Sequence, residues 1–176
     1  HDNRQSGGWV KHASDVIFSQ NLAHDIRNNS GGPGPCFGQQ YGPERVWYIA
    51  NEGHHCNVGI IAGSGDPPGD GENTFMVGNL IHDTESQNVG DPYNSGCISV
   101  RGPGTVWVVN GTCANTDGGV FAPPGTSALD VWNTIVRRAS GSASSTWDLY
   151  TEGGVTLDVK SSLFSDSPRF TDGNEQ

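Results

Sequence analysis

The sequence has few basic residues and few of the residues that favour helices. Its only lysines are Lys11 and Lys160, and it has a single methionine. Nine lysines and arginines stand against 19 acidic residues, which gives a formal net charge of -10. Nucleic acids and anionic membranes repel a chain this acidic, so neither is expected as a partner.

Long apolar runs are also missing. No segment approaches the roughly 20 apolar residues of a membrane-spanning helix, so membrane insertion is not expected. No stretch keeps the helical period for more than about two turns. The chain begins at His1 without a signal-peptide pattern. These features indicate a single domain over residues 1–176, in a processed product or a fragment of a longer protein.

The four cysteines lack the CxxC spacing that is typical of zinc sites. They are Cys36, Cys56, Cys97 and Cys113. We therefore expect disulfide bonds in an oxidising compartment, which places the protein outside the cell or on its surface. Four cysteines allow three pairings, and their spacing does not choose among them.

What the sequence has in excess is glycine and repetition. One ten-residue segment recurs six times, as VIFSQNLAHD, VWYIANEGHH, TFMVGNLIHD, VWVVNGTCAN, LDVWNTIVRR and TLDVKSSLFS. The copies are centred on Asn21, Asn51, Asn79, Asn110, Asn133 and Ser161. Their spacing of 23 to 31 residues is typical of solenoid repeats.

The period of two that marks a β-strand predicts which side chains of each copy face inward. Four residues before the centre stand Ile17, Trp47, Phe75, Val106, Leu129 and Leu157. Two before it stand Ser19, Ile49, Val77, Val108, Val131 and Val159, and two after it stand Ala23, Gly53, Ile81, Thr112, Ile135 and Leu163. We expect these columns to form a common core. The central amides, stacked about 4.8 Å apart, predict an asparagine ladder.

The units GNLIHD and SGCISVRG are typical of one fold family. From about Asp15 to Ser165 the chain resembles the pectate-lyase-like superfamily of parallel β-helix repeat proteins. The resemblance implies an all-β fold, a right-handed parallel β-helix of about six rungs with an internal asparagine ladder. It implies little about function, because lyases, hydrolases, epimerases, phage tailspikes and adhesins share that architecture.

Polysaccharide lyases of this superfamily need a basic proton abstractor beside arginines to act on a uronate. The candidates for catalysis are Arg101, Arg137, Arg138 and His82. We interpret the arginines as solvated surface residues that pair with nearby acids. Asn115-Thr116-Asp117 resembles a polygalacturonase tripeptide, but the acidic pair that should follow one rung later is missing, so we interpret it as a turn. An enzyme is therefore not the leading expectation.

Three copies place a histidine three residues after the centre, in an outward column of His24, His54 and His82 continued by Cys113. Imidazoles at strand spacing are candidate ligands of a transition metal or general bases. The alternative is a hydrogen-bonded column in which Asp25, His55 and Asp83 cap the turn. A loop with Asp66, Asp70 and Glu72 is a candidate for Ca²⁺, although it matches no defined calcium pattern.

A second outward column, three residues before the centre, is apolar. It contains Phe18, Tyr48, Met76 and Trp107, with Trp132 on the same sheet. An exposed apolar ribbon usually marks an interface. We therefore expect these residues to contact a partner protein, sugar rings or the chain's own termini.

The first and last rungs are incomplete in the sequence, which predicts open ends and end-to-end stacking of copies. These features favour an extracellular structural or adhesive β-helix that self-associates end to end or laterally into a filament or surface layer and contacts glycans. The alternative is a fragment of a polysaccharide lyase, glycoside hydrolase or epimerase. A trimeric phage tailspike segment is a third interpretation.

Overall fold

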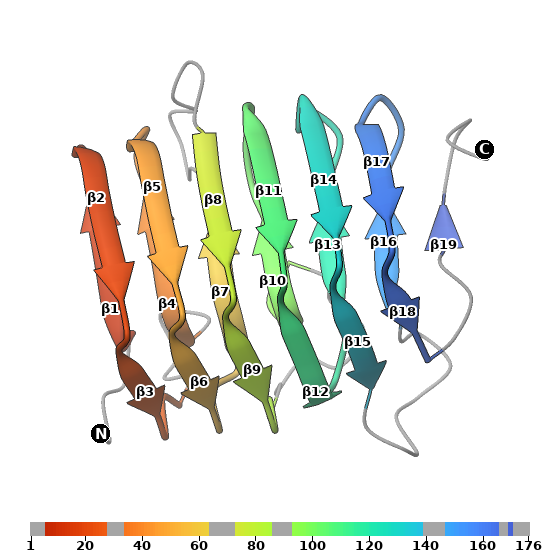
Figure 1. Ribbon diagram of the computed structural model, residues 1–176. Coiled ribbons are helices and arrows are strands. Elements are labelled where there is room, and N and C mark those ends of the chain that lie inside the picture. The colour runs from red at the N-terminus through yellow and green to blue at the C-terminus, as the bar shows by residue number, and fades with distance from the viewer. Residues whose placement is uncertain are drawn as a thin grey trace.

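The computed structural model describes residues 6–27, 34–63, 73–85, 93–138, 147–165 and 169–170 (Figure 1). These residues form strands and turns, and none of them lies in a helix. Consequently, the described part of the chain holds no helix that could cross a membrane. The all-β expectation is confirmed.

The strands form three sheets, and all their pairings are parallel. The first sheet contains β1 (Gly8–Lys11), β4 (Pro35–Gln40), β7 (Val58–Ala62), β10 (Gly96–Val100), β13 (Val120–Ala122), β16 (Leu149–Thr151) and β19 (Arg169–Phe170). The second contains β2 (Ser14–Ser19), β5 (Glu44–Ile49), β8 (Asn73–Val77), β11 (Thr105–Val109), β14 (Ala128–Trp132) and β17 (Thr156–Lys160). The third contains β3 (Leu22–His24), β6 (Glu52–His54), β9 (Leu80–His82), β12 (Thr112–Thr116), β15 (Ile135–Arg138) and β18 (Leu163–Phe164).

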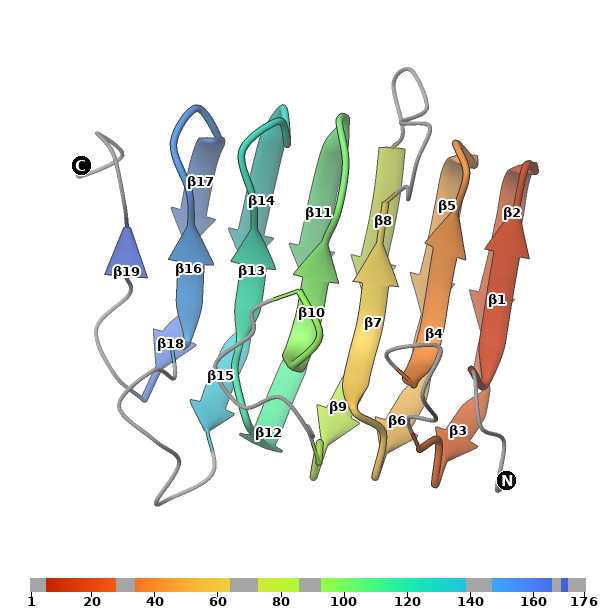
Figure 2. The same cartoon turned by 180° about the vertical axis from the view of Figure 1, so that it is seen from behind.

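The chain visits the three sheets in turn, so three consecutive strands form one rung. Rung 1 is β1 to β3, and rung 6 is β16 to β18. The rungs lie side by side in chain order, with the second and third sheets on the near side of Figure 1 and the first sheet on the near side of Figure 2. This strand order is compatible with the expected β-helix.

The core lies between the sheets. In the second sheet its side chains form two columns, Val16, Val46, Thr74, Val106, Leu129 and Leu157, and Phe18, Tyr48, Met76, Val108 and Val131. Val159 of rung 6 is in register with the second column but is 38% exposed. The first sheet contributes Phe37, Ile60, Ile98, Val120 and Leu149. The hydroxyl of Tyr48 donates to Gln39 Oε1 at 3.4 Å, and Gln39 Nε2 donates to Thr74 Oγ1 at 2.9 Å. These bonds pair the side-chain polar groups of Tyr48, Gln39 and Thr74 with one another inside the core.

The expected register is wrong by one residue in the second sheet of rungs 1 to 3. Ile17, Trp47 and Phe75, and likewise Ser19, Ile49 and Val77, face outward instead of inward. A slip of one residue moves every side chain of a strand to the opposite face. In rungs 4 to 6 the error lies in the third sheet, where Thr112, Ile135 and Leu163 face outward and Cys113, Val136 and Phe164 face inward.

The turn between the second and third sheets explains this slip, because each rung has two turn positions that suit asparagine. The first position has φ between +49° and +66° and holds Gln20, Ala50, Gly78, Asn110, Asn133 and Ser161. The second points into the coil and holds Asn21, Asn51, Asn79, Gly111, Thr134 and Ser162. Asparagine tolerates the left-handed conformation of the first position and bonds across rungs at the second.

The internal ladder is present in rungs 1 to 3. Asn21 Nδ2 donates to Asn51 Oδ1 at 2.9 Å, and Asn51 Nδ2 donates to Asn79 Oδ1 at 3.0 Å. The expectation that Asn110 and Asn133 continue it is wrong. They lie at the first turn position and form a separate, exposed contact, in which Asn133 Nδ2 donates to Asn110 Oδ1 at 2.8 Å.

Both expected disulfides are present, and the structure settles their pairing. Cys36 pairs with Cys56 and Cys97 with Cys113, with Cα–Cα distances of 5.6 and 5.8 Å. In rung 2, Cys36 of β4 pairs with Cys56, which lies two residues after the third-sheet strand β6. In rung 4, Cys97 of β10 pairs with Cys113 of the third-sheet strand β12. Two such bonds fit an extracellular protein.

Candidate functional site

The outward aromatic column is composed of different residues from those expected. Phe18, Tyr48 and Met76 point into the core, and Tyr48 and Met76 are fully buried there. Burial raises the pKa of the Tyr48 hydroxyl above its ordinary value. Trp107 and Trp132 are on the outside, as expected.

The actual outward column of the second sheet begins with Ile17, Trp47, Phe75 and Trp107. The rings of Trp47 and Phe75 stack with centroids 5.2 Å apart, and those of Phe75 and Trp107 with centroids 4.5 Å apart. Because the three residues are paired in register, the strand spacing of about 4.8 Å sets the stacking distance. The rings cover one another's faces and present their edges outward, a poor surface for a sugar ring that stacks on a free aromatic face.

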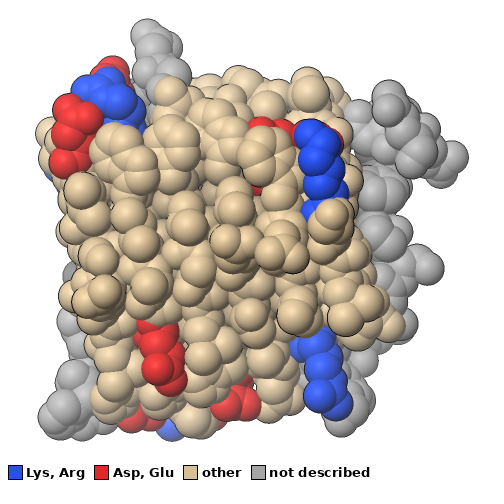
Figure 3. Space-filling view, viewed as in Figure 1, with Lys and Arg blue, Asp and Glu red and all other residues tan. Residues whose placement is uncertain are grey.

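Further apolar residues extend this column into a broad surface, which we call the apolar flank. It combines the stacked column with a second column on the same sheet, Ile49, Val77, Val109 and Trp132, and with an outward column of the third sheet, Leu22, Glu52, Leu80, Thr112, Ile135 and Leu163. In rungs 5 and 6 the stacked column continues with Asp130 and Asp158. Exposure is 36% for Val77, 38% for Leu80 and 47% for Ile135. Figure 3 shows this side of the molecule, with Lys, Arg, Asp and Glu toward its margins and a wide central area without them.

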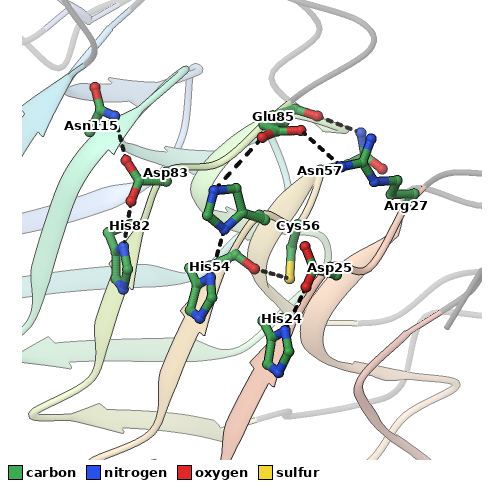
Figure 4. Close-up of polar contacts among 11 residues, drawn as sticks. His24, Asp25, Arg27, His54, Cys56, Asn57, His82, Asp83, Glu85 and Asn115 are labelled. Carbon is green, nitrogen blue, oxygen red and sulfur yellow. Dashed lines mark hydrogen bonds and ion pairs between the residues drawn. The ribbon is translucent and has the colours of Figure 1, made fainter. Parts of the chain in front are cut away.

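The expected histidine column is present on the third sheet (Figure 4). His24, His54 and His82 project from β3, β6 and β9, and their rings stack with centroids 5.1 and 4.9 Å apart. Cys113 does not continue the column, because Ala114 is the residue in register with His82 and Cys113 points inward.

The residue after each histidine fixes the orientation of the ring. His24 Nδ1 lies 2.7 Å from Asp25 Oδ2, and His82 Nδ1 lies 2.7 Å from Asp83 Oδ2. In the middle rung the corresponding partner is His55, whose Nδ1 lies 2.7 Å from His54 Nδ1. The middle imidazole therefore has another imidazole as its partner where its neighbours have carboxylates.

This difference separates the histidines electrostatically. Partial burial lowers the pKa of His54, and the nearby imidazoles of His82, His55 and His24 lower it further. Burial also opposes protonation of His82, but hydrogen bonds to Asp83 and Glu52 outweigh it and raise the pKa of His82. The pKa of Asp83 is lowered by hydrogen bonds from Asn115 and His82, and that of Asp25 by His24.

The histidine column is not arranged around a single metal ion. Among the described residues, no group of three or more His, Cys, Asp or Glu side chains could hold one. The stacked rings lie parallel along the column, whereas metal ligands converge on a point. The candidate Ca²⁺ ligands Asp66, Asp70 and Glu72 lie outside the described residues.

The structure separates the candidate catalytic arginines. Arg101 follows β10 of the first sheet, and Arg137 lies in β15 of the third sheet, in register with Ala114 of the histidine column. Strands β10 and β15 end at opposite edges of the molecule (Figures 1 and 2). The backbone of Arg138 belongs to β15, and its side chain lies outside the described part. Arg101 and Arg137 therefore do not lie in one site.

Arg101 lines a shallow depression that the sequence did not reveal. Its guanidinium donates to the carbonyl oxygen of Tyr93, to Asn94 Oδ1 at 2.9 Å and to Ser99 Oγ at 3.4 Å. The depression has a volume of about 590 Å³ and is lined by Tyr93, Arg101, Gly102, Pro103, Pro123, Pro124 and Gly125. The signal in the sequence is the pair of turns GPG and PPG, which follow β10 and β13, neighbours in the first sheet.

No family model, curated protein or solved structure matches this chain. The resemblance to the pectate-lyase-like superfamily therefore stays a prediction, and the function has to be argued from the surface itself.

Proposed function

We propose that this chain is a right-handed parallel β-helix that works outside the cell as a structural or adhesive element and attaches sideways through the apolar flank. The observation that carries this proposal is the recurrence of outward apolar side chains over successive rungs, from Trp47 through Phe75 to Trp107 and beside them from Leu80 to Ile135. The handedness follows from the strong preference of parallel crossover connections for the right hand.

The flank suits attachment because an extended apolar surface is costly to leave in water. Contiguous exposed apolar patches on soluble proteins mark interaction sites far more often than chance. The side chains come from adjacent parallel strands, which hold them at fixed spacing without the mobility of loops. A rigid surface loses little conformational entropy when it binds.

The two disulfides support the extracellular setting, since such bonds form and persist in oxidising compartments. The net charge of -10 keeps the remaining surface well solvated and separates copies everywhere except at the flank. Attachment is therefore expected sideways, in a surface layer or bundle.

Adsorption measurements test this proposal. A quartz-crystal microbalance would record binding of the chain to alkyl-coated, cellulose-coated and bare silica. We expect binding to at least the alkyl surface, and at least about a tenfold loss for Val77→Lys, because that change puts a charge in the centre of the flank. Ser127→Lys, at an exposed position outside the flank, should leave adsorption unchanged. Equal adsorption of the parent chain and both variants, or none at all, would refute attachment through the flank.

A second candidate function is action on, or binding to, an acidic polysaccharide at the depression beside Arg101. An arginine next to an exposed aromatic ring suits recognition of a uronate, and Tyr93 is 39% exposed there. Incubation with a polysaccharide panel, followed by assay of unsaturated products and new reducing ends, tests it. Activity or binding that Arg101→Ala abolishes would favour this function over the structural element.

A further inference from the structure

We propose that the partner of the apolar flank is a second copy of this chain, which packs face to face with its rungs in the opposite order, so that rung 2 lies over rung 5. This inference rests on the proposed attachment through the flank and names its partner. Three properties of the described surface carry it: its size, its composition and the position of two charges.

The flank has the size of a standard protein interface. Six rungs about 4.8 Å apart, each with about eight strand residues in the second and third sheets at about 3.3 Å per residue, cover roughly 750 Å² per copy. A typical stable interface buries about 800 Å² on each partner. A second copy therefore covers the flank without leaving a wide apolar margin.

The composition of the flank is that of an interface core. Such cores are enriched in aromatic side chains and depleted of charge. The flank centres on the stacked rings of Trp47, Phe75 and Trp107, and the acidic residues of its columns, Glu52, Asp130 and Asp158, lie outside that stack. A chain with a net charge of -10 repels its own copies. The central area without charged side chains in Figure 3 is where two such chains can meet with the least repulsion.

Two charges on the third sheet select the orientation. Glu52 in rung 2 and Arg137 in rung 5 both point outward and are exposed, two residues apart in register. In a symmetric face-to-face pair the two-fold axis lies in the plane of contact. An axis along the strands, between β8 and β11, sets rung 2 over rung 5 and forms two Glu52–Arg137 pairs.

The other principal direction for the axis, along the stack of rungs, sets each rung on its own copy. It lays the second sheet over the third and brings the two Glu52 carboxylates toward each other near the boundary of the sheets. Opposed like charges disfavour that arrangement, and opposite charges favour the first. On the second sheet, Arg45 in rung 2 pairs with Asp15 in rung 1, and Lys160 pairs with Asp158, both in rung 6. Because each of these carboxylates has its own cation, they do not disfavour the arrangement that sets rung 2 over rung 5.

Sedimentation velocity and disulfide trapping test the pair and its orientation together. All four native cysteines are bonded, so an introduced cysteine supplies the only free thiol. Ile17 in rung 1 and Asp158 in rung 6 lie in the same outward column at opposite ends of the flank. We expect a dimer in solution, and oxidation of an equimolar mixture of Ile17→Cys and Asp158→Cys should give a cross-linked dimer.

Either cysteine variant alone should give little cross-linking, because the two equal positions lie five rungs apart in the proposed pair. Arg137→Glu and Glu52→Arg should each weaken dimerisation by about tenfold, and the double variant should recover the parent affinity. A monomer at all soluble concentrations, a larger oligomer, or a dimer that the mixture fails to trap overturns the inference. A monomer that still adsorbs through the flank overturns the partner assignment alone and leaves the proposed function standing.

Discussion

At the scale of single residues, the internal ladder supports the turn by a fixed pattern of hydrogen bonds. Asn51 donates from its backbone nitrogen to Asn79 Oδ1 at 3.0 Å, while its Nδ2 also donates to the carbonyl of Phe18 at 3.0 Å in the preceding rung. Asn79 Nδ2 bonds to the carbonyl of Tyr48 in the same way, at 2.8 Å. The side chain of Asn51 thus links its own rung to the rungs on both sides of it.

Gly111 interrupts the ladder at rung 4, because it has no side chain to accept from the N–H of Asn79. A Cβ at Gly111 would lie 3.4 Å from Val108 Cγ1 and 3.6 Å from Thr134 Cγ2, which are ordinary contacts, and a small cavity adjoins it. We predict that Gly111→Asn stabilises the fold by about 1 kcal/mol and raises Tm by about 2–4 °C, through restored bonds and a less flexible unfolded chain. Thermal unfolding by circular dichroism measures this.

Gly78→Asn provides the matched control for that prediction. Gly78 has φ of +66°, a conformation that asparagine tolerates, and an added Cβ would meet no atom within 4 Å. It lies at the first turn position, outside the core, so its replacement should change Tm by less than about 1 °C. A lower Tm for Gly111→Asn than for the parent chain would show that the ladder cannot be extended.

The same turn shows what the sequence could predict and where it was ambiguous. The six copies, the parallel strands and the apolar period of two were readable, because backbone geometry imposes them. The register was not, since Asn110 and Asn79 are the same residue type in two different roles one position apart. Polarity also favoured the wrong face, because the outward Trp47 and Phe75 are more apolar than the inward Thr74. Strands whose outward residues are more apolar than their inward residues therefore mark the apolar flank in the sequence.

At the scale of strands, the histidine column follows from three parallel strands in register, and the period of two predicted it correctly. The roles of His55 and Glu52 could not be predicted. The role of His55 depends on its left-handed turn conformation, with φ of +51°. The role of Glu52 depends on a contact of 3.1 Å between its Oε1 and His82 Nε2 in the next rung. Neither is visible in a linear pattern.

The column should titrate in a defined order. Because the pKa of His82 is raised and that of His54 lowered, His82 gains its proton first as the pH falls. The contribution of His82 to stability is present below pH 6.5 and is lost as the pH rises through its folded pKa; that of His54 is present above pH 6.5 and is lost as the pH falls. Histidine ring resonances followed by NMR against pH measure both transitions.

Removing one ring should shift the other. We predict that His82→Gln raises the pKa of His54, because the neighbouring charge that opposes its protonation is gone. His12→Gln is the control, since His12 stacks on Tyr41 rather than on the column. A His54 transition that stays in place in His82→Gln, or one that precedes His82 in the parent chain, would contradict this electrostatic account.

At the scale of the whole molecule, two opposing forces decide whether copies meet. The apolar flank favours contact, and the net charge of -10 on each copy opposes it. Salt screens the long-range repulsion between two bodies much more than it weakens the burial of apolar surface. Salt also weakens the two proposed Glu52–Arg137 pairs, but their attraction is smaller than the repulsion between two copies that each carry a net charge of -10.

We therefore predict that association of the intact chain tightens as salt rises at neutral pH. Between about 0.02 M and about 0.5 M NaCl the dissociation constant from sedimentation equilibrium should fall at least about threefold, since the screening length shrinks from beyond 10 Å to a few Å. Near the sequence pI of about 4.7 the net charge vanishes, so the same salt change should have little effect there. An association that weakens with salt at neutral pH would mean that ion pairs, and not the apolar flank, hold the copies together.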